Sequence, residues 1–263
     1  YNSIYTYGQK SGLFHLKRAK DCYEYDEVMQ EFEKVDLPAV KIVLTGTGRV
    51  ASGAVEVLEG MKIKRVRPQE LINKSYDYPV YAQLSVADYH QPKRKKEFDQ
   101  EHFYKNPGEY TSAFQPFMKC ADILISGVYW DPKAPALFTV KDMQQPDFKI
   151  KVIGDITCDI EGSIPSTKKA STIDEPVYDF NPKKNSLEPP FSSTGNVSVM
   201  AIDNLPSELP RDASHDFGKT LLEAVIPELL SDTNSEMIAS ATITEHGHLT
   251  APYQYLHNYV FGN

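Results

Sequence analysis

The residues with the clearest chemical meaning form the run Gly46-Thr-Gly-Arg-Val-Ala51, which has the pattern G-x-G-x-x-A. The apolar residues at 40–44 predict a buried strand before it, and apolar residues at helical spacing predict a helix behind it. In such a turn the first glycine permits a sharp bend, the second leaves room for a pyrophosphate, and the alanine lets helix and strand pack closely. The helix N-terminus would then bind the phosphates. The run predicts a dinucleotide site, with a purely structural glycine turn as the alternative.

The choice of dinucleotide depends on the residues about twenty positions after Gly46. NAD sites usually carry Asp or Glu there, whereas this chain has Arg67 at the end of the expected second strand. A guanidinium group suits a 2′-phosphate, so Arg67 favours NADP. The alternative is that Arg67 is a solvated residue and that Glu70 binds the ribose of NAD.

The composition is that of an ordinary soluble protein with one or two domains, with 41% hydrophobic and 24% charged residues among 263. The net charge of −8 argues against nucleic acid or an anionic membrane as partner. No apolar stretch approaches the roughly 18 residues that a membrane span needs. Three scattered cysteines without C-x-x-C predict a cytoplasmic protein rather than a disulfide scaffold or a zinc site. Because the chain begins without Met or a signal peptide, we expect a fragment.

The alternation of strands and helices predicts an α/β, Rossmann-like fold: a doubly wound, mostly parallel sheet with helices on both faces. We expect helices over 3–35, with Asp26 as a cap, and strands over 41–45, 64–67, 80–86, 121–129, 149–156 and 197–202. We also expect a polar excursion over 89–106, a helix over 107–120, and a long loop over 162–194. Farther along we expect a helix over 213–231 bent at Pro227 and a hairpin over 242–250.

In a sheet of this kind the ligand lies beyond the carboxyl ends of the strands. Gly46, Gly127, Asp155 and Asp203 all fall near strand ends, so we expect them around one crevice. Asp155 and Asp159 would share a face of an extended strand, and we place Asp155 near the cofactor, with Asp159 as the alternative start of the long loop. We expect no metal site, and we interpret 246–248 (His-Gly-His) as a turn.

Further motifs lie at residues 127–130, 154–159, 162–164, 172–176 and 201–213, with a weaker one at 104–110. These runs resemble the lysine–2-oxoglutarate reductase part of the aminoadipic semialdehyde synthases. The pattern at 204–211 also resembles the wider alanine dehydrogenase and transhydrogenase superfamily. The run 202–206 is similar to the fungal lysine-forming saccharopine dehydrogenases. The resemblance covers about residues 40 to 260.

The resemblance implies an NAD(P)-dependent oxidoreductase of lysine metabolism that acts on CH–NH donors. Its substrates would be lysine, 2-oxoglutarate and saccharopine, and it could form a homo-oligomer. The ε-amine of lysine condenses with the ketone of 2-oxoglutarate, and a hydride reduces the imine to saccharopine, or the reverse occurs. In these families a separate N-terminal domain supplies the Lys and His that do the acid–base work, so we expect this chain to lack them. The alternatives are an alanine dehydrogenase-like enzyme and a non-catalytic NAD(P)-binding regulatory module.

The resemblance also places Asp203 near the nicotinamide and the catalytic pair, so Asp203 is the expected catalytic residue, with a turn aspartate as the alternative. We expect the cofactor to be bound by Thr45, Gly46, Gly48, Arg49, Val50, Arg67, Gly127, Tyr129, Asp155, Asn204 and Leu205. The expected domains are linker helices over 1–39, a dinucleotide-binding Rossmann domain over 40–205, and a C-terminal helix and hairpin over 206–263 that close it.

Overall fold

The computed structural model describes residues 1–128, 130–231 and 235–262. The chain divides into two compact units, Tyr1–Leu209 and Pro210–Asn263, which are described here one at a time. The first unit contains the sheet, both of its flanking layers and the glycine turn.

The first unit is built on one eight-stranded sheet with the order β2-β3-β1-β6-β7-β10-β8-β9. Its six parallel strands are β1 Lys41–Thr45, β2 Lys64–Arg65, β3 Val80–Leu84, β6 Ile123–Ser126, β7 Val152–Asp155 and β10 Val197–Met200. Two antiparallel strands, β8 Tyr178–Asn181 and β9 Ser186–Glu188, complete one edge. This architecture confirms the predicted doubly wound, mostly parallel α/β fold.

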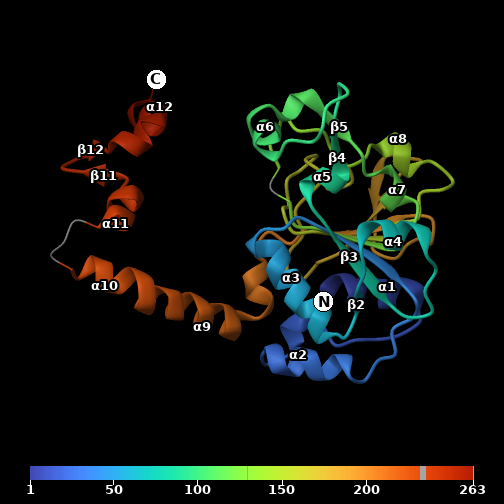
Figure 1. Ribbon diagram of the computed structural model, residues 1–263. Helices are drawn as coiled ribbons and strands as arrows, with labels where there is room; N and C mark the ends of the chain where they lie inside the picture. The colour runs from blue at the N-terminus through green and yellow to red at the C-terminus, as the bar shows by residue number, and fades with distance from the viewer. Residues whose placement is uncertain (129, 232–234, 263) are drawn as a thin grey trace. The chain divides into compact units, whose positions relative to one another are not determined.

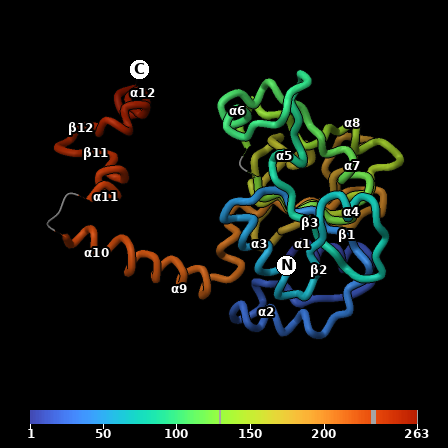
Figure 2. The backbone as a smooth tube through the Cα atoms, viewed as in Figure 1, coloured from blue at the N-terminus to red at the C-terminus, as the bar shows by residue number. Residues whose placement is uncertain are grey.

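Helices cover both faces of this sheet (Figures 1 and 2). One face carries α1 Asn2–Ser11, α2 Tyr25–Phe32 and α3 Arg49–Gly60, and the other carries α4 Pro68–Asn73, α7 Gln115–Met118 and α8 Val140–Met143. The strand β1 shows why both layers are needed. Ile42 and Leu44 pack with the first layer, whereas Val43 between them packs with the second.

The predicted excursion from the sheet is confirmed. It contains α5 Val86–Tyr89, β4 His90–Pro92, α6 Gln100–Lys105, the 3₁₀ turn η2 Pro107–Glu109 and β5 Tyr110–Ser112. Strands β4 and β5 pair with each other and form a separate two-stranded sheet. The predicted helix over 107–120 is wrong, because Tyr110 is buried against Phe98 and Phe103 and its backbone pairs with Pro92. Aromatic packing here overrides the helix start that Pro107 suggests.

Of three further local predictions, the first is confirmed only in part, by α1 and α2, and the other two are wrong. The helical stretch over 3–35 is interrupted, because Gly12 (φ 69°) ends α1 and only the short turn η1 Ala19–Asp21 precedes α2. The N-cap of α2 is Glu24, and Asp26 lies in its first turn. Strand β7 ends at Asp155, and Cys158 has a φ of 57°, so Asp155 and Asp159 do not share a strand face.

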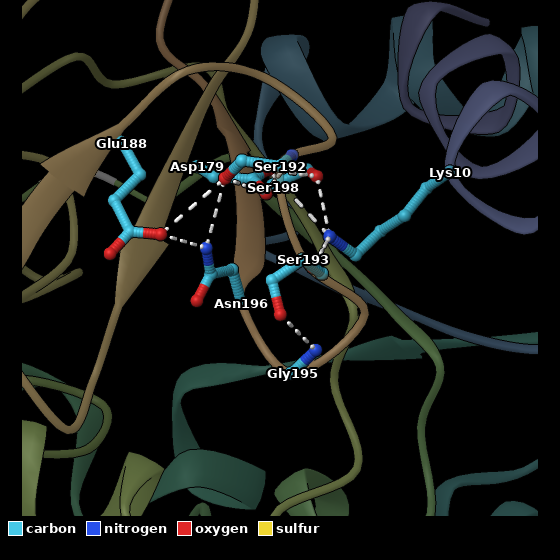
Figure 3. A network of polar contacts seen from close by, with 8 residues as sticks. All are labelled: Lys10, Asp179, Glu188, Ser192, Ser193, Gly195, Asn196 and Ser198. Atoms are coloured by element: carbon cyan, nitrogen blue, oxygen red, sulfur yellow. Dashed lines mark hydrogen bonds and ion pairs between the residues drawn. The ribbon is translucent and has the colours of Figure 1, made fainter.

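The predicted loop over 162–194 contains the hairpin β8–β9, so that prediction is wrong in its centre. Figure 3 shows the contacts that hold this hairpin against the rest of the sheet. Lys10 of α1 forms an ion pair with Asp179 of β8, with Nζ and Oδ1 3.6 Å apart and the side chains 6% and 0% exposed. Asp179 also accepts a hydrogen bond from Ser198 of β10 at 2.6 Å, and Lys10 donates to the same hydroxyl at 3.0 Å. A buried charge needs such partners, and they join three elements that are far apart in the sequence.

The second unit begins with α9 Pro210–Thr220, the π-helical turn η4 Leu221–Val225 and α10 Ile226–Leu229. The regular helix therefore breaks in the turn before Pro227, whose ring nitrogen has no N–H to donate. The second unit continues with α11 Glu236–Ala241 and with the predicted hairpin of β11 Thr244–Glu245 and β12 His248–Leu249. It ends with η5 Ala251–Leu256 and α12 His257–Phe261. Over the described residues, no helix is long and apolar enough to cross a membrane.

Candidate functional site

A cleft of about 810 Å³ lies where the carboxyl ends of β3, β1, β6 and β7 meet. Its lining comes from the glycine turn at 46–50, from residues 85–107 after β3, from residues 127–137 after β6, and from residues 156–163 after β7. Two smaller cavities, of about 590 and 380 Å³, lie away from the glycine turn. The cleft is therefore the site that the parallel sheet predicts for a ligand.

Two glycines, Gly46 and Gly127, lie at the ends of β1 and β6 and line the cleft. Gly46 has a φ of 102°, and its N–H donates to the carbonyl of Leu84 at 2.9 Å. A Cβ on Gly46 would lie 2.6 Å from the carbonyl oxygen of Gly127, and the N–H of Gly127 donates to Thr45 at 3.1 Å. Both glycines are needed because the ends of β1 and β6 approach each other this closely.

Gly48 has a different role from Gly46. It is the N-cap of α3, its φ is an ordinary −85°, and a Cβ there would meet nothing within 4 Å. No side chain caps the helix at this end, whereas Ala51 is fully buried behind it. The space beside Gly48 and the uncapped N–H groups of α3 fit the pyrophosphate of a dinucleotide.

Arg49 and Val50 follow Gly48 and both line the cleft. Val50 is 52% exposed, so this apolar side chain of the helix faces the cleft rather than the sheet. The last residues of β1 and β6, Thr45 and Ser126, are direct neighbours in the sheet and fully buried. Their hydroxyl groups have no hydrogen-bond partner within the described part of the chain.

Arg67 lies at the carboxyl edge of the sheet but one strand farther from β1 than a twenty-residue count implies. The strand next to β1 is β3, and β2 is the edge strand beyond it. Arg67 starts α4, is 82% exposed on its side chain, and pairs with Glu70 at 3.2 Å. Arg67 and Lys74 hold the pKa of Glu70 down to about 2. Arg67, the residue predicted to favour NADP, and Glu70, the alternative ligand of an NAD ribose, thus form an ion pair with each other.

The strand order reveals other residues at the position expected for Arg67. Ser85 and Val86, which follow β3, line the cleft. Arg65 of β2 donates to Gln83 at 2.9 Å, and Gln83 donates to the carbonyl of Gly46 at 3.0 Å. Counting along the chain misses these residues, because it assumes that the second strand lies next to the first.

Asp155 lies beneath the cleft and is 2% exposed. It accepts hydrogen bonds from the hydroxyls of Thr157 at 2.7 Å and Thr167 at 2.6 Å. Burial raises the pKa of Asp155 although these hydrogen bonds oppose the shift. The lining of the cleft includes Thr157 and Asp159 instead, so Asp155 anchors the loop that bears them.

Asp203 and Asn204 lie between β10 and the 3₁₀ turn η3 Leu205–Glu208, which Leu205 begins, and all three residues are exposed. They are absent from the residues that line the cleft among those described. Burial, together with the charges of Asp155 and Asp203, raises the pKa of the Cys158 thiol to about 11. This thiol stays protonated and donates to the carbonyl of Ile202 at 3.1 Å.

Tyr129, also expected at the cofactor, lies outside the described residues. The sequence interpretation did not identify the aromatic residues Tyr89, His90, Phe103 and Tyr104, which line the cleft on the side of β3. In the part of the chain that the structure describes, no group of three His, Cys, Asp or Glu side chains could hold a metal ion.

No protein-family model matches the chain. Individual proteins do match it. The chain is 30% identical over 257 residues to an alpha-aminoadipic semialdehyde synthase of Arabidopsis thaliana. This match covers 88% of the chain and 24% of that protein. The chain is 31% identical over 247 residues to the mitochondrial alpha-aminoadipic semialdehyde synthase of Mus musculus, covering 81% of the chain and 26% of that protein.

A shorter match links the chain to fungal enzymes. It is 32% identical over 114 residues to a saccharopine dehydrogenase [NAD(+), L-lysine-forming] of Schizosaccharomyces pombe, covering 42% of the chain and 28% of that protein. The chain thus spans about a quarter of the length of the relatives that match it. The predicted resemblance is confirmed: the chain is similar at moderate identity to alpha-aminoadipic semialdehyde synthases over most of its length, and to a saccharopine dehydrogenase over less than half of it.

Proposed function

We propose that the chain is the nicotinamide-dinucleotide-binding part of an oxidoreductase that interconverts lysine and 2-oxoglutarate with saccharopine. The observation that carries the proposal is the open space at Gly48 beside the uncapped N-terminus of α3. Such a helix end binds a pyrophosphate. The names of the relatives support this reaction over an alanine dehydrogenase-like activity or a regulatory role.

The residues of the chain have distinct parts in this function. The turn at 46–48 binds the pyrophosphate, while Thr45, which is fully buried at the end of β1 and is not among the residues that line the cleft, remains a proposed cofactor contact. The bound nicotinamide supplies or accepts the hydride at the carbon of the substrate. Asp203, Asn204 and Leu205 remain proposed contacts near the reacting groups, and Asp203 remains the proposed catalytic residue of this chain.

We propose NADP rather than NAD as the preferred form. Arg49 supports this choice as an exposed guanidinium that lines the cleft. Arg67, which lies one strand beyond β3 and is not among the residues that line the cleft, remains the proposed contact of the 2′-phosphate. The relative from Schizosaccharomyces pombe carries NAD(+) in its name, so the choice needs a direct measurement.

The experiment is a fluorescence titration of the 263-residue chain with NADPH and with NADH. The expected result is saturable binding with a lower Kd for NADPH. Arg67→Asp should reduce the preference for NADPH about tenfold, which is about 1.4 kcal/mol. Equal affinities, unchanged in the variant, would overturn the NADP assignment. Absence of binding to both dinucleotides would contradict the proposed function of the chain.

We further propose a cytoplasmic protein that could form a homo-oligomer. The three cysteines are free in the structure, which suits a reducing compartment. The mouse relative is named as mitochondrial, so the compartment needs its own test by localisation of the tagged protein.

A further inference from the structure

The side of the cleft that follows β3 is a wall of packed rings, which we call the aromatic wall (Tyr89, His90, Phe103 and Tyr104). His90 stacks on Phe103 with ring centroids 4.9 Å apart and an angle of 25°, and Tyr89 contacts His90 edge-on at 4.9 Å. Tyr104 contacts Phe103 edge-on at 5.7 Å. In Figure 1 these residues belong to the adjoining elements α5, β4 and α6.

Tyr104 differs from the other rings of the aromatic wall in its exposure. Tyr89, His90 and Phe103 are buried, whereas Tyr104 lines the cleft and is 61% exposed. Gln100, one turn earlier in α6, donates to the phenol oxygen of Tyr104 at 3.2 Å. Tyr104 is therefore a tethered ring that offers a surface to a ligand in the cleft.

The aromatic wall offers no positive charge to a phosphate. The basic run at 93–96 lies between β4 and α6, but its described side chains Lys93, Arg94 and Lys96 line a separate cavity and none of them lines the cleft. Burial lowers the pKa of His90 to about 4, so its imidazole is neutral near pH 7. The wall suits a neutral, flat group rather than an anionic one.

The topology of the sheet decides which part of a dinucleotide meets this wall. The pyrophosphate belongs at α3, and the ribose of the adenosine half belongs at the strand next to β1. That strand is β3, and the aromatic wall follows β3 directly. We infer that the aromatic wall binds the adenine base of the dinucleotide and that the base stacks on Tyr104. This inference rests on the proposed function and adds a residue that selects for the base.

The test measures the Kd of the 263-residue chain for two reduced ligands, NADPH and nicotinamide mononucleotide. The second ligand lacks adenosine. Tyr104→Ala should weaken NADPH binding about tenfold or more, because stacking contributes about 1–3 kcal/mol per base. The matched variant Tyr104→Phe keeps the ring and should change this Kd by less than about twofold. Neither variant should change the Kd for the mononucleotide.

The outcomes separate the inference from the proposed function. If Tyr104→Ala left NADPH binding unchanged, or weakened both ligands equally, the adenine assignment would be wrong and the dinucleotide site would stand. If the unaltered chain bound neither ligand, both the inference and the proposed function would fall. Thermal unfolding of both variants checks that the fold is retained, and the exposure of Tyr104 predicts that it is.

Discussion

Gly46 and Gly127 lie so close together that a methyl group on Gly46 would be 2.6 Å from the carbonyl oxygen of Gly127. The contact joins the ends of β1 and β6, and the φ of 102° at Gly46 adds a second reason for glycine. The glycine that the fingerprint assigns to a sharp turn is thus also a packing residue between neighbouring strands.

Gly46→Ala should therefore destabilise the fold, whereas Gly48→Ala should not. We expect a loss of about 2 kcal/mol or more in the free energy of unfolding for Gly46→Ala, since strain and a clash act together. For Gly48→Ala, at an ordinary φ and in open space, we expect a change below about 1 kcal/mol. Urea unfolding of the two variants measures both values. Equal stability losses would contradict the separate roles of the two glycines.

The sequence predicts the strand–turn–helix unit from Lys41 to Gly60 well, because local patterns determine it. The sequence does not predict the features that depend on contacts between residues far apart along the chain. The hairpin β8–β9 depends on Lys10, some 170 residues earlier. The ribose position depends on the order of the strands, which places β3 rather than β2 beside β1. Residue spacing along the chain predicts neither feature, because both depend on how the strands assemble into the sheet.

Asp155 should anchor the loop at 157–167 in a pH-dependent way. Asp155→Ala leaves two threonine hydroxyls and the N–H of Thr157 without their acceptor, and we expect a loss of about 1–3 kcal/mol in stability. The folded-state pKa of Asp155 is above its ordinary value of 3.8. The protonated form is thus favoured by folding, so this contribution to stability is present below pH 3.8 and is lost as the pH rises through the raised pKa.

The conservative variant Asp155→Asn isolates this titration, because its amide keeps the shape of the carboxyl group and carries no proton equilibrium. Relative to the unaltered chain, Asp155→Asn should become more stable as the pH rises from about 4 to about 7. Urea unfolding at several pH values gives the difference, in which the other titrating groups cancel. A difference that moves in the opposite direction would show that ionised Asp155 is favoured by folding.

Loss of the buried ion pair between Lys10 and Asp179 should reduce the free energy of unfolding far more than loss of an exposed ion pair. Lys10→Met leaves the buried Asp179 carboxylate without its cation, and we expect a loss of about 3–5 kcal/mol in the free energy of unfolding. The matched control is Lys20→Met, which breaks the pair with Asp174 at 2.7 Å. Because the Asp174 side chain is 89% exposed, water screens this pair and the change should leave the free energy of unfolding nearly unchanged. Similar losses in both variants would contradict the structural role given to Lys10.

We propose above that the space beside Gly48 holds the pyrophosphate of a nicotinamide dinucleotide. The most direct measurement compares the Kd for NADPH of the unaltered chain with those of Gly48→Ala and of Gly53→Ala. Gly53 is the matched control: it also lies in α3 with open space around its Cβ position, and it does not line the cleft. We expect Gly48→Ala to weaken NADPH binding at least about tenfold at unchanged fold stability, and Gly53→Ala to bind NADPH with an unchanged Kd. Unchanged binding by Gly48→Ala would contradict this proposal.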